Sequence, residues 1–278
     1  AFDSAGQRCS ALRVLCLQDE IADHTLKMLR GAMAECRMGN PGRLTTDIGP
    51  VIDSEAKANI ERHIQTMRSK GRPVFQAVRE NSEDAREWQS GTFVAPTLIE
   101  LDDFAELQKE VFGPVLHVVR YNRNQLPELI EQINASGYGL TLGVHTRIDE
   151  TIAQVTGSAH VGNLYVNRNM VGAVVGVQPF GGEGLSGTGP KAGGPLYLYR
   201  LLANRPESAL AVTLARQDAE YPVDAQLKAA LTQPLNALRE WAANRPELQA
   251  LCTQYGELAQ AGTQRLLPGP TGERNTWT

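Results

Sequence analysis

FDSAGQRCSALRVL, residues 2–15, places a cysteine between a Gly-Gln turn and a short apolar run. Because Gly6 lacks a Cβ, the backbone can bend tightly there and turn the thiol of Cys9 toward a cleft. Arg8 adjoins Cys9, and its charge can favour the thiolate that a nucleophilic cysteine needs. The stretch therefore predicts a reactive cysteine or, since free cysteines are usually small buried residues, a structural one.

Strands and helices alternate outward from this stretch. Apolar stripes at helical spacing and capping residues predict helices over 19–36, 53–70, 125–135 and 149–158. Short apolar runs predict strands over 12–17, 73–79, 92–101, 115–121, 140–146 and 163–167. This alternation is typical of an α/β fold, with an open, largely parallel sheet flanked by helices.

The composition changes toward the C-terminal end. Ala, Gln, Leu and Glu dominate residues 224–261, which predicts two helices with a break near Pro246. Residues 262–278 read as extended or loosely ordered. We therefore expect a domain over residues 1–204, followed by a mainly helical tail over residues 205–278.

Composition excludes several classes of function. The 278 residues carry a net charge of −4, which argues against a nucleic-acid-binding surface. They contain no apolar run of ~18 residues, so we expect no membrane-spanning helix. The cysteines show no CxxC spacing and no nearby histidine cluster, so we expect no metal site. Their small number predicts reduced thiols in the cytoplasm.

The pattern F-x-x-x-G-Q-x-C-x-A at residues 2–11 resembles the active-site signature of the aldehyde dehydrogenase superfamily. The resemblance implies the catalytic domain of that family. It also implies that Cys9 attacks an aldehyde, that the hemithioacetal gives a hydride to NAD, and that the resulting thioester is hydrolysed. The backbone N–H of Cys9 would then help to hold the oxyanion.

A second motif, EVFGPV at residues 110–115, carries the same resemblance. By itself it is a turn, with Glu110 in solvent and Phe112 in the core. In aldehyde dehydrogenases the same string contributes to the nicotinamide end of the cofactor site. The resemblance therefore implies that Glu110 accepts hydrogen bonds from ribose hydroxyls and that Phe112 packs near the ribose and the ring.

A third motif lies in residues 172–194, GAVVGVQPFGGEGLSGTGPKAGG, which hold nine of the 26 glycines. This segment lacks G-K-[ST] and the strand–GxGxxG–helix context of phosphate-binding loops. Its interleaved apolar residues argue against a flexible linker. It resembles the PFGG-x-x-x-SG-x-G segment of aldehyde dehydrogenases, a loop that lines the substrate entrance.

Ser10 together with Gly172 and Ala173 resembles the pattern of 1-pyrroline-5-carboxylate dehydrogenases, which oxidise L-glutamate γ-semialdehyde. The resemblance implies that the Ser10 hydroxyl and the two backbone N–H groups hold the substrate's α-carboxylate. Phe180 and Phe2 would form apolar walls for the methylene chain. Without the resemblance, Ser10 is a strand-start residue and the phenylalanines belong to the core.

With its tail, the whole chain resembles the proline utilization A family of Gram-negative bacteria. That family joins an FAD-dependent proline dehydrogenase to this aldehyde dehydrogenase. Its NAD-binding Rossmann domain and its hydrolytic base precede the cysteine and have no counterpart here. We therefore expect a segment of a longer polypeptide that is inactive alone, needs upstream domains and belongs to a homodimer. Peripheral contact with the inner membrane, through other parts of that polypeptide, is implied by the resemblance only.

Three alternatives stay open. The substrate can be another carboxylated aldehyde, such as succinate semialdehyde. A cysteine hydrolase or acyltransferase would need a histidine base near Cys9, and no motif supports His24, His63, His117, His145 or His160 in that role. The chain can also serve as an assembly module only.

Overall fold

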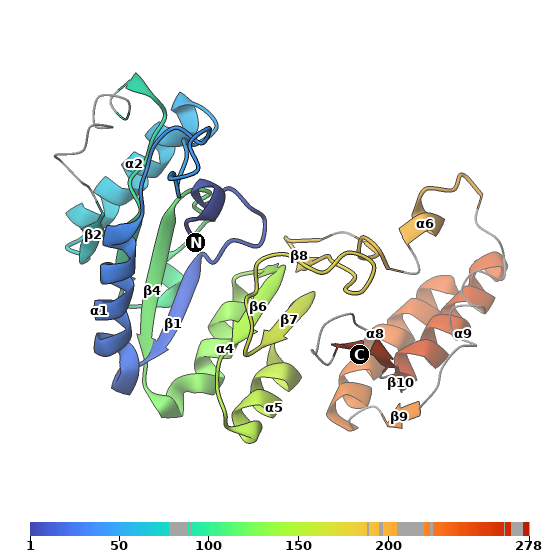
Figure 1. Cartoon of the computed structure of the whole chain (residues 1–278). Coiled ribbons are helices and arrows are strands. Elements are labelled where there is room, and N and C mark those ends of the chain that lie inside the picture. Colours follow the sequence, from blue (N-terminus) through green and yellow to red (C-terminus); the bar gives the residue numbers. More distant parts are fainter. Residues whose placement is uncertain are drawn as a thin grey trace. The chain divides into compact units, whose positions relative to one another are not determined.

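The computed structural model describes residues 1–77, 88, 90–187, 189–194, 197–204, 220–222, 225–263, 265–267 and 275–277. The chain divides into two compact units, shown in Figure 1. The first comprises Ala1–Ala173 and Phe180–Gly189, and the second comprises Val174–Pro179 and Pro190–Thr278.

A four-stranded sheet organises the first unit, in the order β1-β4-β3-β2. Its strands are β1 (Val14–Gln18), β2 (Val74–Gln76), β3 (Thr97–Leu101) and β4 (Val115–Tyr121). β4 pairs in parallel with both β1 and β3, which confirms the largely parallel sheet. β2 pairs antiparallel with β3 at one edge, which strand patterns alone did not indicate.

Two long helices cover opposite faces of this sheet. α1 (Asp19–Glu35) and α2 (Ser54–Ser69) lie close to their predicted bounds. The carboxylate of Asp53 caps α2 by accepting the N–H of Ala56 at 2.7 Å. At the other end, Gly71 adopts a left-handed φ of 77° just beyond the helix.

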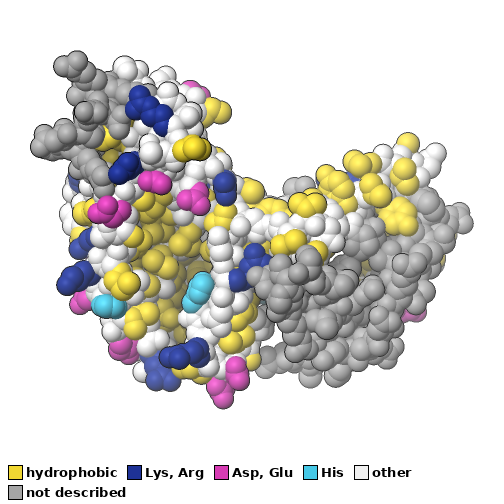
Figure 2. All heavy atoms as spheres, in the orientation of Figure 1, with side chains coloured by type: hydrophobic (Ala, Val, Ile, Leu, Met, Phe, Trp, Pro, Cys, Tyr) yellow, Lys and Arg dark blue, Asp and Glu magenta, His cyan; other side chains and the backbone are white. Residues whose placement is uncertain are grey.

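Alternate residues of the strands fill two hydrophobic cores, as the period of two in a strand requires. Val115 and Val119 of β4 pack with Ile60 of α2 on one face. Val118 packs with Leu26 of α1 on the other. β1 lies at an edge, so its side chains apart from the buried Leu17 are only partly covered, and Figure 2 shows hydrophobic side chains over β1 and β4 next to α1.

A smaller α/β arrangement completes the first unit. α4 (Leu126–Ala135) leads to β5 (Tyr138–Gly139) and β6 (Thr141–Val144). α5 (Asp149–Ser158) then connects β6 to β7 (Asn163–Val166), with which β6 pairs in parallel. β5 pairs antiparallel with β8 (Glu183–Gly184). Short 3-10 turns lie at Asp3–Gly6 (η1), Phe104–Glu106 (η2) and Arg123–Gln125 (η3).

The described part of the second unit is mainly helical, and it contains the helices expected after residue 204. α6 (Tyr197–Arg200) precedes the two predicted helices, α8 (Ala225–Ala242) and α9 (Pro246–Gln260), which break where expected. Short strands appear in the final segment, which was read as extended or loosely ordered, and one, β9 (Glu220–Pro222), appears before α8 where no strand was predicted. β10 (Ala261–Thr263) pairs with β9, and β11 (Arg265–Leu267) pairs with β12 (Asn275–Trp277).

Among the described residues, none of the helices combines the length and the apolar character needed to cross a bilayer.

The topology brings two of the sequence motifs together. The Cys9 loop precedes β1 and the EVFGPV segment precedes β4. Because β1 and β4 are parallel neighbours, their amino ends lie at the same edge of the sheet. The two loops are therefore adjacent, although distant in sequence.

Candidate active site

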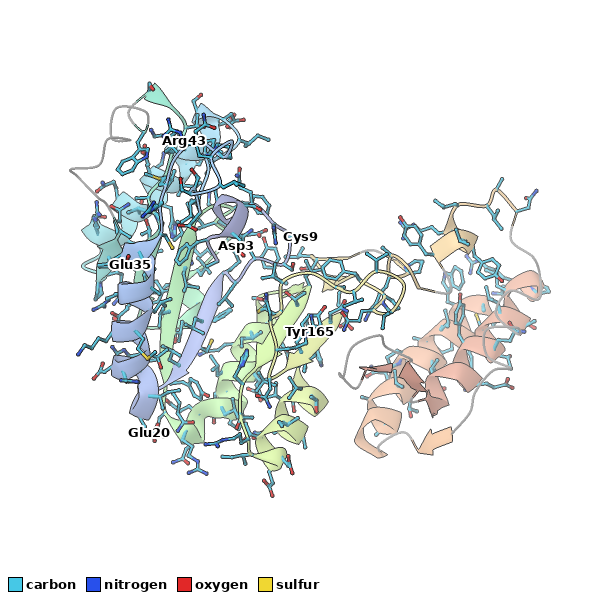
Figure 3. All side chains as sticks on the ribbon, viewed as in Figure 1. Asp3, Cys9, Glu20, Glu35, Arg43 and Tyr165 are labelled. Carbon is cyan, nitrogen blue, oxygen red and sulfur yellow. The ribbon has the colours of Figure 1, made fainter. Side chains whose placement is uncertain are left out.

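Cys9 lies in a tight loop between η1 and β1, where Figure 3 labels it. Three successive residues before it have left-handed backbones: Ser4, Ala5 and Gly6, with φ of 54°, 53° and 67°. The N–H of Gln7 closes this turn by donating to the Ser4 carbonyl at 3.0 Å. Left-handed residues other than glycine are strained, and such strain is often found at functional sites. The loop leaves the Cys9 thiol free and exposed.

The side chain of Arg8 bonds away from the thiol. Nε of Arg8 donates to Ser4 Oγ at 3.1 Å. The backbone carbonyl of Arg8 accepts the N–H of Ala11 at 3.1 Å. In the described part of the chain, no hydrogen bond joins Arg8 to Cys9. The basic residue next to Cys9 in sequence is therefore hydrogen-bonded to Ser4, and not to the thiol, among the described residues.

Gln7 anchors the loop to the segment that leads into α2. Its Oε1 accepts the N–H of Ile52 at 2.8 Å, and its Nε2 donates to the Pro50 carbonyl at 3.3 Å. The Gln of the G-Q-x-C pattern therefore has a structural role that sequence analysis did not assign.

Gly6 packs directly against the EVFGPV segment. A Cβ on Gly6 would overlap the carbonyl group of Gly113, and a Cβ on Gly113 would overlap the side chain of Ile60 in α2. Two glycines from different motifs thus stack between the Cys9 loop and the helix. Their small size, and the positive φ of Gly6, permit this approach.

Arg13 joins the same two motifs through its side chain. Its Nε donates to Glu110 Oε1 at 2.9 Å, and its Nη2 donates to the Arg8 carbonyl at 3.0 Å. Its Nη1 donates to the carbonyls of Gly6 at 2.6 Å and of Gly113 at 3.5 Å. The guanidinium carbon also lies 4.6 Å from the centre of the Phe112 ring, which is a cation–π contact.

The charge of Arg13 is balanced within the site. Burial lowers the pKa of the guanidinium, and the Glu110 carboxylate opposes this shift through its charge and its hydrogen bond. Cys9 acts on the pKa of Arg13 in the same direction as Glu110, although more weakly. Arg13, four residues after the cysteine, is therefore a basic group that bonds to Glu110 and whose charge also interacts, more weakly, with Cys9.

Ser10 links the Cys9 loop to the glycine-rich segment. Its side chain is buried, and its Oγ accepts the N–H of Gly172 at 3.0 Å. The carbonyl of Gly172 in turn accepts the hydroxyl of Tyr165 at 3.1 Å. No described residue accepts the N–H of the following residue, Ala173. The predicted carboxylate-binding residues are thus brought together.

Glycines of this segment and of the loop before β7 allow close packing. A Cβ on Gly162 would overlap the carbonyl of Gly181, and a Cβ on Gly184 would run into the carbonyl of Gly137. Gly184 is also part of β8, which pairs with Tyr138 of β5. These glycines let the backbone of the segment lie directly on neighbouring strands and loops.

The predicted aromatic residues differ in their surroundings. Phe2 is half-buried and packs against both hydrophobic cores of the sheet. Phe180 is half-buried. Phe112 is 46% exposed beside Arg13, so it does not belong to the core as its position in a turn suggested.

The remaining cysteines lack the exposure of Cys9. Burial raises the pKa of Cys16 to about 12, so its thiol stays protonated near neutral pH. Cys36 is half-buried and donates its S–H to the Ala32 carbonyl, and Cys252 is buried in the second unit. The residues that the structure describes contain no group of three or more side chains arranged to hold a metal ion.

Two histidines, His63 and His117, form a hydrogen-bonded pair next to the backbone of Arg13. Nδ1 of His117 lies 3.1 Å from the Arg13 carbonyl, which can only accept, so we place a proton on that nitrogen. Nε2 of His117 then accepts a hydrogen bond from Nε2 of His63 at 2.8 Å. Across the described residues, none of the five histidines is hydrogen-bonded to Cys9. A histidine-activated cysteine hydrolase therefore gains no support.

Sequence analysis missed Arg13, Gln7 and Tyr165. A signal existed for Arg13, because a charged residue at the start of an apolar strand needs a partner when it is covered. Its partner Glu110 is 97 residues away, so the sequence did not reveal the pair.

Comparisons with known proteins identify relatives of the chain. A profile described as "Aldehyde dehydrogenase family" matches residues 1–203. Over all 278 residues the chain is 88% identical to "Bifunctional protein PutA" of Salmonella typhimurium and covers 21% of that protein. Over 200 residues, 71% of the chain, it is 38% identical to "1-pyrroline-5-carboxylate dehydrogenase 1" of Halalkalibacterium halodurans, of which it covers 37%.

A solved structure resembles the chain in its fold. Proline utilization A (PutA) of Bradyrhizobium japonicum matches with a TM-score of 0.66 and 52% identity, over 71% of this chain and 19% of that one. These matches confirm the resemblance and the α/β fold class expected from the three motifs. The chain spans only 21% of the length of the PutA relatives that it matches over its whole length.

Proposed function

The chain belongs to the aldehyde dehydrogenase family, and from this we propose that it is the thiol-bearing part of an NAD-dependent enzyme that oxidises L-glutamate γ-semialdehyde to L-glutamate. One observation carries the proposal: the Cys9 loop is bonded both to the Glu110 motif and to Gly172. Relatives named 1-pyrroline-5-carboxylate dehydrogenase support the choice of substrate.

Cys9 supplies the nucleophile. Its thiolate sulfur adds to the aldehyde carbon, which forms a C–S bond and leaves the negative charge on the former carbonyl oxygen. The backbone N–H of Cys9 has no acceptor among the described residues, so it is free to donate to that oxygen. Loss of a hydride from the same carbon then leaves a thioester on Cys9. Water releases L-glutamate and restores the thiol.

Glu110 and Phe112 fit the nicotinamide end of NAD. The Glu110 side chain is 37% exposed, and its Oε1 is held by Arg13, while Oε2 has no partner among the described residues. A carboxylate oxygen is a suitable acceptor for ribose hydroxyls. The exposed Phe112 ring offers an apolar surface for the ribose and the ring. When bound, NAD supplies the acceptor for the hydride.

Ser10 and Ala173 fit the substrate's α-carboxylate, whereas the N–H of Gly172, which the resemblance also assigns to the carboxylate, donates to Ser10 Oγ instead. Because Ser10 Oγ accepts the Gly172 N–H, its own hydroxyl hydrogen remains free to donate to the carboxylate. The unpartnered N–H of Ala173 supplies a second donor beside it. In this proposal Phe180 and Phe2 form the apolar walls for the methylene chain.

We further propose that the chain works within a longer polypeptide. The PutA relatives are about five times its length. The chain alone is then inactive, and upstream domains supply the hydrolytic base and the rest of the NAD site. An FAD-dependent proline dehydrogenase on the same polypeptide, a homodimer, and a boundary near residue 204 belong to this proposal.

The test is NADH formation from L-glutamate γ-semialdehyde by the full-length protein that carries this chain. We expect Cys9→Ala to abolish turnover, because no other described cysteine combines exposure with a position in the loop. Cys36→Ala is the matched control and should keep normal turnover. Undiminished NADH production by Cys9→Ala would refute the assignment.

The substrate is tested by comparing this aldehyde with succinate semialdehyde, which lacks the amino group and is one carbon shorter. A higher kcat/KM for succinate semialdehyde would overturn the proposed specificity. NADH formation by the 278-residue chain alone would contradict its proposed dependence on other domains.

A further inference from the structure

Arg13 makes contacts that no motif accounts for. Its side chain is only 15% exposed, and all three of its nitrogens are engaged. Two of the accepting carbonyls, those of Gly6 and Arg8, belong to the loop just before the nucleophile. The other acceptors, Glu110 and the carbonyl of Gly113, belong to the cofactor motif.

We propose that Arg13 is a positioning residue that fixes the distance and orientation between the Cys9 loop and the Glu110–Phe112 segment. The inference rests on the proposed function, which assigns Cys9 to the aldehyde and Glu110 to NAD. Arg13 sets the alignment of these two reactants. Arg13 itself contacts neither reactant, and it acts through the two loops.

Hydrogen bonds to the backbone of Arg13 fix the position from which its side chain extends. Its carbonyl accepts two hydrogen bonds from His117 of β4, from the backbone N–H at 3.0 Å and from Nδ1 at 3.1 Å. His117 is almost fully buried at the centre of the sheet. The backbone of Arg13 is therefore bonded to β4, and its side chain extends to Glu110 in the loop that precedes β4.

Only a guanidinium satisfies this arrangement. Its planar fork offers five N–H donors at fixed angles, so one side chain can serve two carbonyls on one loop and a carboxylate on the other. A lysine at this position keeps the charge but has a single ammonium at its tip, which cannot reach all of these acceptors at once. Arg13→Lys therefore separates the geometric role from the charge.

Misalignment should lower the rate and leave aldehyde binding intact. A displacement of about 1 Å between reacting groups can cost about a hundredfold in rate. We expect Arg13→Lys in the full-length protein to lower kcat for NADH formation about a hundredfold. The KM for the aldehyde should change by less than about threefold, because Ser10 and Gly172 remain in place.

Arg72→Lys is the matched control. Arg72 is 21% exposed and bonds two carboxylates, Asp102 and Glu106. Among the described residues, no hydrogen bond joins its side chain to the Cys9 loop. Arg72→Lys should keep kcat within about twofold of the unchanged protein. The proposal is overturned if Arg13→Lys retains its kcat, or if Arg72→Lys loses as much.

Hydrogen–deuterium exchange provides a test that does not depend on activity. We expect Arg13→Lys to raise exchange together in peptides covering residues 6–12 and 110–114, with other peptides of the first unit unchanged. Arg72→Lys should leave both peptides protected. Faster exchange in only one of the two peptides, or throughout the unit, would contradict a positioning role.

The exchange measurement also separates this proposal from the proposed function. If the unchanged protein forms no NADH from the aldehyde, the proposed function fails, while coupled exchange of the two peptides still supports the role of Arg13. Should Arg13→Lys not fold, Glu110→Gln weakens the same contact from the other side. Unchanged exchange of both peptides in that variant would overturn the proposal.

Discussion

Gly6 shows how a single residue controls the approach of two loops. Its φ of 67° lies in the left-handed region, and its Cα faces the Gly113 carbonyl with no room for a side chain. Any Cβ here would meet a backbone atom, which cannot rotate away as the end of a side chain can. The glycine of the G-Q-x-C pattern is therefore required by both conformation and space.

Gly6→Ala should destabilise the first unit by about 2–4 kcal/mol, since left-handed strain and overpacking add. Gly31→Ala is the control: Gly31 lies in α1 with nothing within 4 Å of an added Cβ. In an exposed helix this change should stabilise by about 0.5–1 kcal/mol. Urea unfolding followed by circular dichroism measures both changes, and equal effects of the two variants would contradict the close approach.

Single residues also show how far the site could be predicted. Cys9, Ser10 and Glu110 could be chosen from short motifs, because such motifs are local in sequence. The bonds from Arg13 to Glu110 and from Ser10 to Gly172 could not, since each joins residues far apart in the chain. Their geometry depends on strand order, which periodicity does not encode.

At the scale of elements, the His63–His117 pair connects α2 to β4. Burial, followed by the nearby His63, lowers the pKa of His117 from its ordinary 6.5 to about 4. Burial also lowers the pKa of His63, and Lys109 and Lys70 add to that shift. Both rings are therefore neutral in the folded protein at neutral pH. The hydrogen bond between them, which joins α2 to β4, is thus a contact between two uncharged groups.

The pair predicts a loss of stability in mild acid. The unfolded chain binds protons at these histidines near pH 6.5, whereas in the folded chain His117 resists protonation until about pH 4 and the pKa of His63 is also lowered. Stability is fully present above pH 6.5 and falls as the pH drops toward 4, by about 3 kcal/mol for a shift of this size at His117. The free energy of unfolding in urea at pH 7.5, 6 and 5 measures the decline.

A variant pair assigns the effect to His117. His117→Gln should flatten this pH dependence, because the titrating group is gone. His24→Gln should not, because His24 is an exposed residue of α1. A decline that persists unchanged in His117→Gln would assign the acid sensitivity to other groups.

Elements differed in how well the sequence predicted them. α1, α2 and α5 were found because each repeats its apolar residues over several turns, and β4 because its apolar run is long and buried on both faces. β5 and β8 have two residues each, and β9 to β12 have three. Such strands exist through pairing with a partner, and two or three residues carry no readable period.

At the scale of the whole molecule, the division into two units predicts two unfolding events. Each unit has its own buried residues, such as Val118 in the first and Cys252 in the second. Calorimetry of the chain should therefore show two transitions. Gly6→Ala should lower the temperature of one transition only.

Tryptophan fluorescence assigns the transitions. Trp88 is the tryptophan of the first unit, and its Nε1 donates to the Met38 carbonyl at 2.8 Å. In Trp88→Phe the remaining fluorescence reports the second unit, so its midpoint should not move when Gly6→Ala is added. A single transition seen by every probe would contradict the independence of the units.

The parallel pairing of β1 with β4 also has a consequence for the order of folding. The two strands pair across a long sequence separation, since Arg13 and Glu110 are 97 residues apart. Contacts of such high contact order form late, after the entropy of closing a long loop has been overcome. α1 and α2 can form early from local contacts. Cys9 comes next to the Glu110 segment only after β1 has paired with β4. A growing or partly folded chain therefore exposes a thiol that is not yet part of any site.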